Sequence, residues 1–209
     1  MNIQDFEILT KTRSSHRKFL EDEIPKKDIE KLIELAGTAP SGHNHQPWQF
    51  IVVTDEKMKQ EIEEVLNNKL EKIKNSLPEN FAEKFEKFTF FITHFLTAPV
   101  IIFVLGNKQE YISTKVRAAA GKVMPKAANF DMELLDIGAA VQNILLGATA
   151  MGYGSCWLTA PINYAQKDLE SVLGVEQGYN LLSVVSVGKP TKQRKQAVRK
   201  SLDQTLTFK

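Results

Sequence analysis

The 209-residue sequence predicts an α/β or α+β domain built around a central sheet. Four short runs rich in apolar and β-branched residues alternate with segments whose apolar residues recur at helical spacing. No tight hairpin signal joins consecutive strand-like runs, and no fixed-period repeat indicates a solenoid. The content of 43% hydrophobic and 25% charged residues is typical of globular domains, and the length favours a single domain over residues 1–209.

Helical spacing dominates the beginning of the chain. Asn2 is placed to cap a helix over residues 3–11, because its side chain can accept a hydrogen bond from the first turn. After a loop at 12–25, residues 26–36 carry apolar side chains at positions i, i+3, i+4 and i+7. Gly37 then stands at the expected C-terminal cap of this second helix.

Two predicted strands flank a long helical region. Residues 48–54 (WQFIVVT) and 100–105 (VIIFVL) are aromatic and β-branched, which favours buried strands. Between them, Asp55 is placed to cap a helix that the apolar spacing carries to Leu77. Phenylalanines at helical spacing predict a further helix over residues 81–95, with its phenylalanine stripe in the core.

The second half of the chain repeats the alternation of helix and strand. Residues 131–151 are apolar nearly all round and rich in small side chains, which predicts a helix packed closely on every side. Residues 155–159 and 181–187 are predicted strands. Between them we expect a helix over 163–173, begun by an Asn-x-x-Gln capping pattern at Asn163.

Two segments lack a clear pattern. Residues 107–130 are weakly patterned and moderately basic, and we expect an excursion or lid there. Residues 189–209 are expected to form a C-terminal arm, with six basic residues in the twelve from Lys189 to Lys200. A basic-arm nucleic-acid binder stays an alternative, but the net charge of +2 and the lack of interleaved aromatics favour a protein without a nucleic-acid partner.

The sequence favours a cytoplasmic protein without a membrane partner. The N-terminal residues lack the apolar stretch of a secretory signal, and runs such as Pro99–Gly106 are far shorter than the roughly 18 residues of a membrane span. The single cysteine, Cys156, cannot form an internal disulfide, and its apolar setting favours a buried structural thiol.

A first polar cluster, Arg13-Ser14-Ser15-His16-Arg17, follows the first predicted helix. Arginine presents planar bidentate donors to phosphate oxygens, and serine hydroxyls and turn amides can fill the remaining acceptor positions. The cluster therefore suits a phosphate group. A solvated turn with surface salt bridges is the alternative.

A second polar segment, residues 39–48 (APSGHNHQPW), precedes the first predicted strand. Prolines stiffen both ends, and its serine, asparagine and glutamine could face the edge of a heteroaromatic ring. A rigid loop that is polar for turn chemistry alone is the alternative. His43-x-His45 has no third ligand at sensible spacing, so we expect no metal site. The sequence also lacks a Walker loop, a Gly-x-Ser-x-Gly elbow and a dinucleotide fingerprint.

Taken together, three blocks at residues 13–19, 39–48 and 152–158 resemble the nitroreductase family of FMN-dependent flavoproteins in order and spacing. The resemblance implies an α+β fold with a central, mostly antiparallel sheet flanked by helices. It also implies an intertwined homodimer that holds FMN in two equivalent clefts at the subunit interface, with the C-terminal arm embracing the partner.

The resemblance implies three groups of flavin-binding residues by motif position. The phosphate and ribityl chain would be bound by Arg13, Ser14, Ser15, Arg17 and Arg199. The other side of the flavin would be lined by Pro40, Ser41, Asn44 and Gln46, and the N5 edge would face the backbone amides of Leu158, Thr159 and Ala160. The family often has an arginine at the position of Ser14 and glycine near Thr159 and Ala160.

The resemblance also implies an activity, with chemistry centred on the flavin and no catalytic side chain. NADH or NADPH would deliver hydride to FMN N5, and an electron-poor small molecule such as a nitroaromatic or quinone would then be reduced in the same space. The alternatives are a specialised FMN enzyme of this fold, for dehalogenation or flavin fragmentation, and a non-catalytic flavin-binding protein.

Overall fold

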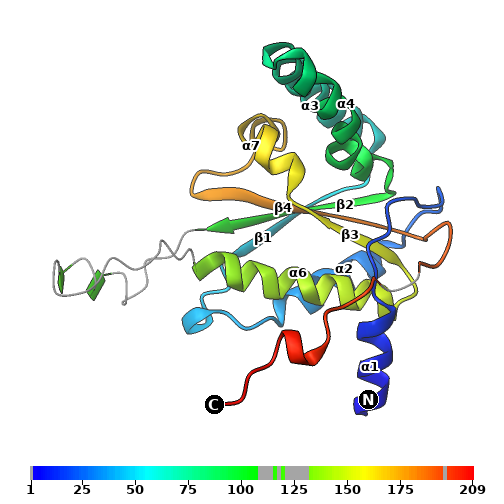
Figure 1. Ribbon diagram of the computed structural model, residues 1–209, viewed down its shortest axis with the longest axis vertical. Coiled ribbons are helices and arrows are strands. Elements are labelled where there is room, and N and C mark those ends of the chain that lie inside the picture. The colour runs from blue at the N-terminus through cyan, green and yellow to red at the C-terminus, as the bar shows by residue number, and fades with distance from the viewer. Residues whose placement is uncertain (1, 108–114, 117–118, 121–131, 195–196) are drawn as a thin grey trace.

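The computed structural model describes residues 2–107, 115–116, 119–120, 132–194 and 197–209 (Figure 1). Most of the predicted excursion at 107–130 therefore lies outside the described residues. The described chain forms one four-stranded sheet with helices on both faces, so the predicted α+β class is confirmed. No helix in these ranges is long and apolar enough to cross a membrane. The cytoplasmic location stays a prediction.

The sheet is antiparallel throughout, in the order β1-β2-β4-β3. Its strands are β1 (Trp48–Val53), β2 (Val100–Asn107), β3 (Gly154–Leu158) and β4 (Tyr179–Gly188). All four correspond to the predicted runs. The central strands β2 and β4 are buried along almost their whole length, whereas β1 and β3 form the two edges.

Helices cover the sheet in two layers, above and below it in Figure 1. The upper layer contains α3 (Glu56–Ser76), α4 (Glu79–Thr93) and α7 (Ala160–Val172), and the lower layer contains α1 (Ile3–Thr12), α2 (Lys26–Gly37) and α6 (Met132–Ala150). Each layer of helices forms a hydrophobic core with one face of the sheet, and successive residues of a strand point alternately into the two cores. Phe103 packs in the upper core and Ile102 in the lower one, as the two-residue period of a strand requires.

Side-chain capping accounts for the beginnings of α1 and α3 and for the end of α2. The side chains of Asn2 and Asp55 accept hydrogen bonds from the first turns of α1 and α3, which confirms both predicted caps. Gly37 is instead the last helical residue of α2, and Thr38 caps it by donating its hydroxyl to the Leu35 carbonyl at 2.8 Å.

The predicted cap at Asn163 is wrong. Helix α7 begins three residues earlier, at Ala160, with Pro161 in its first turn, where the missing N–H of proline costs no helical hydrogen bond. The Gln166 side chain does not reach back to the helix start and donates to the Leu181 carbonyl at 3.0 Å. The Asn-x-x-Gln pattern therefore serves contact with β4 and does not begin the helix.

Two expectations about buried helices hold only in part. Phe85 and Phe95 are buried, but Phe81 and Phe88 are 56% and 40% exposed, because α4 is the outer helix of its layer and packs along one side only. Similarly, the middle of α6 is buried, whereas Leu134 and Leu135 near its beginning are exposed.

Candidate functional site

The segment that carries the first polar cluster lies along the edge of the sheet. The His16 amide donates to the Ser155 carbonyl of β3 at 2.9 Å, and the Leu20 amide donates to the Lys189 carbonyl at 2.8 Å. Two glycines allow this close approach. A Cβ at Gly154 would lie 2.9 Å from His16 Cβ, and one at Gly188 would lie 2.8 Å from Phe19 Cβ.

A cavity of about 640 Å³ opens where this segment meets the end of β3, α1, α6 and the C-terminal arm. It brings together four of the predicted flavin-binding residues, Arg13, Ser15, Thr159 and Arg199, and its other lining residues are Thr10, Lys11, Gln142, Leu145 and Trp157. The predicted residues come from three segments that are far apart in the sequence.

The cavity is positively charged and has one aromatic wall. Lys11 pairs with Glu7, but no ion pair within the described chain involves Arg13 or Arg199. Trp157 is 42% exposed although its neighbours in β3, Cys156 and Leu158, are buried. Unpaired guanidinium groups, hydroxyls and an exposed indole form a suitable lining for an anionic aromatic ligand.

The structure does not bring Ser14 and Arg17 into this cavity. The Ser14 hydroxyl lies 3.0 Å from Nε2 of His16. Arg17 lines a neighbouring cavity with Lys18 and Phe90, and its Nε is buried without a hydrogen-bond partner. Leu158 is also buried in the upper core, and Ala160 packs against that core at the start of α7.

Buried titratable groups beside the site are held in their neutral forms. Burial lowers the pKa of His16, and the charges of Arg194 and Arg13 lower it further. Burial also lowers the pKa of His94 and raises the pKa of Cys156. A protonated, buried thiol is unreactive, in keeping with the structural role expected for Cys156.

The second polar segment forms a strained loop containing the short helix η1 (Gly42–Asn44). His43, Asn44 and Gln46 have φ angles of 53°, 55° and 48°, in the left-handed region that favours glycine. The Ser41 hydroxyl accepts a hydrogen bond from the Gln46 amide at 2.9 Å. Three such residues in one short loop indicate a conformation maintained by its surroundings, as is common at functional sites.

One side chain of α6 fixes this loop from outside. The Gly42 amide donates to the Asp136 carboxylate, with both oxygens at 3.3 Å. The rings of His43 and His45 meet edge to face, with centroids 5.8 Å apart. Among the described residues, no group of three or more His, Cys, Asp or Glu side chains is placed to hold a metal ion.

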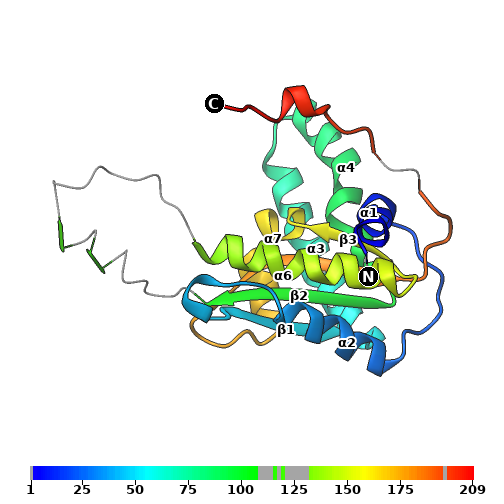
Figure 2. The ribbon, with the colours of Figure 1, turned by 90° about the horizontal axis from the view of Figure 1, so that it is seen from below.

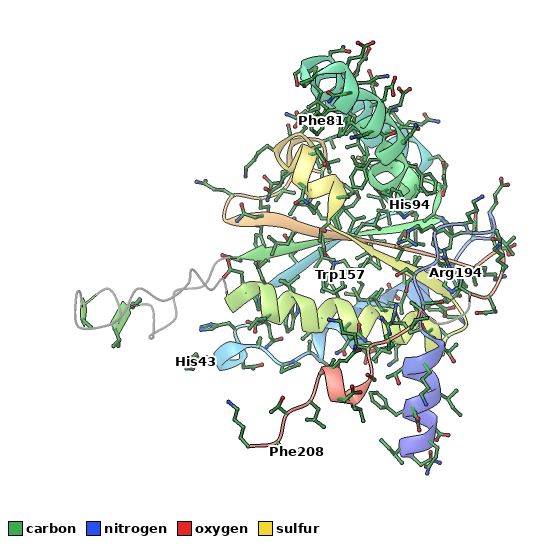
Figure 3. All side chains as sticks on the ribbon, in the orientation of Figure 1. His43, Phe81, His94, Trp157, Arg194 and Phe208 are labelled. Atoms are coloured by element: carbon green, nitrogen blue, oxygen red, sulfur yellow. The ribbon has the colours of Figure 1, made fainter. Side chains whose placement is uncertain are left out.

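The loop and the cavity lie at different positions along α6. Asp136 marks the loop, while Gln142 and Leu145 line the cavity, and nine residues of helix span about 14 Å. Figure 3 shows His43 of the loop and Trp157 of the cavity on opposite sides of α6. Pro40, Ser41, Asn44 and Gln46 therefore do not share a cavity with Arg13 within one chain.

Sequence reasoning missed several residues that line the cavity. Thr10, Lys11, Gln142 and Leu145 belong to helices whose patterns predict only packing or solvent exposure. Trp157 offered the clearest signal, because a large aromatic residue lies between two apolar neighbours in a predicted strand.

The structure combines an antiparallel α+β scaffold with a cation-lined cavity beside the edge strand β3. Comparison with known families identifies the group. The profile of the nitroreductase family matches residues 10–189, and the chain belongs to that family. The predicted family and its fold are thus confirmed.

Several relatives align over most of the chain. An Archaeoglobus fulgidus protein, provisionally named NADH dehydrogenase/NAD(P)H nitroreductase, is 31% identical over 88% of this chain and 84% of its own. Mouse iodotyrosine deiodinase 1 is 30% identical over 99% of this chain and 70% of its own.

Two solved structures share the fold. A BluB-like flavoprotein from Clostridium difficile 630 superposes with a TM-score of 0.83 at 30% identity, covering 100% of this chain and 99% of the other. An iodotyrosine deiodinase bound to FMN and 3-iodo-L-tyrosine has a TM-score of 0.69 at 24% identity, covering 93% and 95%. The second likeness establishes fold alone.

Proposed function

We propose that this protein is an FMN-dependent oxidoreductase that takes hydride from NADH or NADPH and reduces an electron-poor acceptor such as a nitroaromatic or quinone. The observation that carries the proposal is the cavity that gathers Arg13, Ser15, Thr159 and Arg199. Membership of the nitroreductase family supports it, as do the name of the Archaeoglobus relative and the likeness to a BluB-like flavoprotein.

The residues present fit the flavin. A cavity of about 640 Å³ lies within the usual range of roughly 300–1,000 Å³ for ligand pockets. Its two guanidinium groups without carboxylate partners suit a phosphate, and the exposed face of Trp157 suits a flat ring system.

The side chains and amides of the site would then bind and orient the flavin. Arg13 and Arg199 would hold the phosphate, and the Ser15 hydroxyl would hydrogen-bond to it or to the ribityl chain. Backbone amides at Leu158, Thr159 and Ala160 would face the N5 edge. FMN, when bound, supplies the group that accepts and returns hydride, so no side chain is required to form a covalent bond.

We further propose a homodimer in which the strained loop of one subunit completes the cavity of the other. Pro40, Ser41, Asn44 and Gln46 do not line the cavity of Arg13 within one chain, yet the loop is maintained in an unfavourable backbone conformation. In a dimer, these residues would contact the ligand bound in the cavity of the other subunit.

The C-terminal arm supports the same assembly. Val198, Leu202 and Phe208 are 99%, 74% and 89% exposed, and the end of the arm points away from the sheet in both ribbon views (Figures 1 and 2). Beside the outer edge of β1, a groove of about 1170 Å³ presents apolar side chains including Phe50 and Val52. The exposed apolar arm of one subunit would embrace the other subunit and cover such a surface.

The main alternative is a dehalogenating flavoenzyme. The specific observation in its favour is the 30% identity to mouse iodotyrosine deiodinase 1 over nearly the whole chain. An enzyme of this kind would use the same flavin cavity with a halogenated aromatic substrate. A specialised flavin-fragmenting enzyme and a non-catalytic flavin binder are tested by the same measurement.

The test is the visible spectrum of the purified protein before and after anaerobic addition of NADH or NADPH. We expect a yellow protein that is bleached rapidly by a nucleotide and regains its colour with a nitroaromatic or quinone. Slow bleaching by both nucleotides, with dithionite-reduced protein reoxidised by 3-iodotyrosine, would favour the dehalogenase. Colourless protein that refuses added FMN would contradict the proposal.

A further inference from the structure

The C-terminal arm is joined to the N-terminal segment where it leaves β4. The two segments run side by side in both ribbon views (Figures 1 and 2), and the Thr191 amide donates to the Lys18 carbonyl at 3.3 Å. Phe19 and Pro190 form an antiparallel bridge one residue away. Among the described residues, the next backbone hydrogen bonds of the arm lie within residues 201–206. The path of the arm beyond Thr191 therefore depends on contacts of side chains.

The side chain of His16 provides such a contact. Its ring is only 6% exposed, and Nε2 lies 3.0 Å from the Ser14 hydroxyl. Burial and the charges of two arginines lower the pKa of His16, whereas a hydrogen bond with the backbone of Lys192 opposes this lowering. In that bond the ring therefore donates and the Lys192 carbonyl accepts. His16 thus links the N-terminal segment to the arm.

A neutral imidazole is well suited to this link. It carries one N–H donor and one acceptor nitrogen. Donation to the Lys192 carbonyl leaves Nε2 to accept a hydrogen bond from the Ser14 hydroxyl. The charges of Arg194 and Arg13 both act on His16, so a cationic side chain in its place would add a third positive charge beside two guanidinium groups.

The edge of the sheet fixes the base of the ring. A Cβ at Gly154 would lie 2.9 Å from His16 Cγ and 3.1 Å from Pro190 Cβ. The space left by this glycine is therefore shared by His16 and the beginning of the arm. The His16 amide also donates to the Ser155 carbonyl of β3 at 2.9 Å. Because strand β3 holds the backbone of His16, the ring can hold the arm at a defined place.

Both ends of the link lead to the first cavity. Ser14 lies between Arg13 and Ser15, which line that cavity, and Lys192 stands seven residues before Arg199, which lines it too. Seven residues span at most about 25 Å, so the position of Lys192 limits where Arg199 can lie. An arm that is already held at Lys192 loses less conformational entropy when Arg199 contacts a ligand.

We propose that His16 is a positioning residue, which joins the N-terminal segment to the arm and thereby places Arg199 beside Arg13 in the first cavity. The inference rests on the proposed function for the identity of the ligand, and it assigns a role to a side chain outside the lining of that cavity. His16 therefore acts through the arm and not by contact with the flavin.

The test is a double-mutant cycle on the full chain, with FMN affinity measured by quenching of flavin fluorescence. His16→Leu keeps an apolar side chain in the buried space and removes both hydrogen bonds, which should weaken FMN binding about tenfold. In the Arg199→Gln background, the same change should weaken binding less than about twofold, because the residue through which His16 acts is already lost. His16→Gln retains a donor and an acceptor and should stay within about threefold of the wild type.

His94 provides the matched control. It follows the end of α4 and is 5% exposed, and its Nδ1 donates to the Phe90 carbonyl of that helix at 3.0 Å. His94→Leu removes a buried imidazole in the same way. Its effect on FMN affinity should be equal with and without Arg199→Gln, because the hydrogen bond of His94 does not involve the arm.

Amide hydrogen exchange of the arm gives a second readout. Exchange at residues 189–194 and 197–200 should be faster in His16→Leu than in the wild type and unchanged in His94→Leu. Equal effects of His16→Leu in the two backgrounds, or unchanged exchange of the arm, would overturn the proposal. Failure of the wild-type chain to take up FMN would contradict the proposed function, but the exchange measurement would still decide whether His16 holds the arm.

Discussion

The two polar segments of this protein, residues 13–19 and 40–46, are held in place by different means. The first is an extended segment joined to the edge of the sheet by backbone hydrogen bonds and accommodated by two glycines. The second is a loop with three left-handed residues that one carboxylate of α6 fixes from outside. The first segment shares a cavity with Arg199 and with the middle of α6, whereas the second lies near Asp136, closer to the beginning of that helix.

This difference separates two kinds of functional segment. A segment anchored to a sheet is positioned by the core and can bind a ligand within its own chain. In the proposed homodimer, the strained loop of one subunit contacts the ligand held by the other. Flavin affinity should then depend on the first segment through direct contacts and on the second through the assembly of two subunits.

The largest expected effect comes from removing the phosphate charges. Arg13→Gln combined with Arg199→Gln should weaken FMN binding at least about 100-fold, since hydrogen bonds to charged groups contribute roughly 1.5–3 kcal/mol each. Flavin fluorescence quenching measures the affinity. The Lys57→Gln/Lys72→Gln variant serves as the charge-matched control. Full retention of flavin by the double arginine variant would refute the phosphate assignment.

The next effect tests how the first segment is anchored. Gly188→Ala should lower the free energy of unfolding by about 1–3 kcal/mol, because the new methyl group would meet Phe19 and its backbone has little freedom to move. Urea denaturation measures the change. Gly37→Ala is the control, since nothing lies within 4 Å of its added Cβ, and the free energy should rise by up to about 1 kcal/mol. Equal stability of the two variants would show that the segment is not held by this approach.

A smaller effect tests the strained loop. Asp136→Ala removes the acceptor of the Gly42 amide and should weaken FMN binding about fivefold, which corresponds to one hydrogen bond of roughly 1 kcal/mol. Glu133→Ala, one turn earlier on α6, removes the same charge and should leave FMN affinity within twofold of wild type. If both variants bind FMN like the wild type, the loop does not contribute to the flavin site.

The smallest effect concerns pH and tests His16 of the first segment. The pKa of His16 lies below its ordinary value of 6.5, so the unfolded chain binds more protons than the folded one as the pH falls through this range. The free energy of unfolding should decrease from pH 7.5 to pH 5.5, and less steeply in His16→Gln. Buried His94 contributes in the same direction, so some pH dependence should persist. An equal slope in the variant would contradict the assignment.

The sequence was most informative where the causes are local. The caps at Asn2 and Asp55 depend on side chains three residues from their partners, and the strands on the composition of short runs. Gly37 was misassigned because Thr38, the next residue, provides a competing local cap, whereas Asn163 was misassigned because Gln166 contacts β4 instead of the helix start. Exposure of Phe81 likewise depends on which helix lies outermost.

The residue types of the site could be predicted from the sequence, but not which of the residues share a cavity. Arg13 and Arg17 are four residues apart, yet they line different cavities. Arg199 joins Arg13 only through the path of the C-terminal arm. The role of Trp157 required knowing that β3 is an edge strand.

Helix α6 fixes the distance between the strained loop and the cavity that contains Arg13. Asp136 sets the position of the loop, and Gln142 and Leu145 set that of the cavity, so the length of helix between them fixes their spacing and relative rotation. One inserted residue would advance the far end by about 1.5 Å and turn it by about 100°. In the proposed homodimer, a change of length between residues 136 and 145 would therefore have to be matched by a change in the way the two subunits meet.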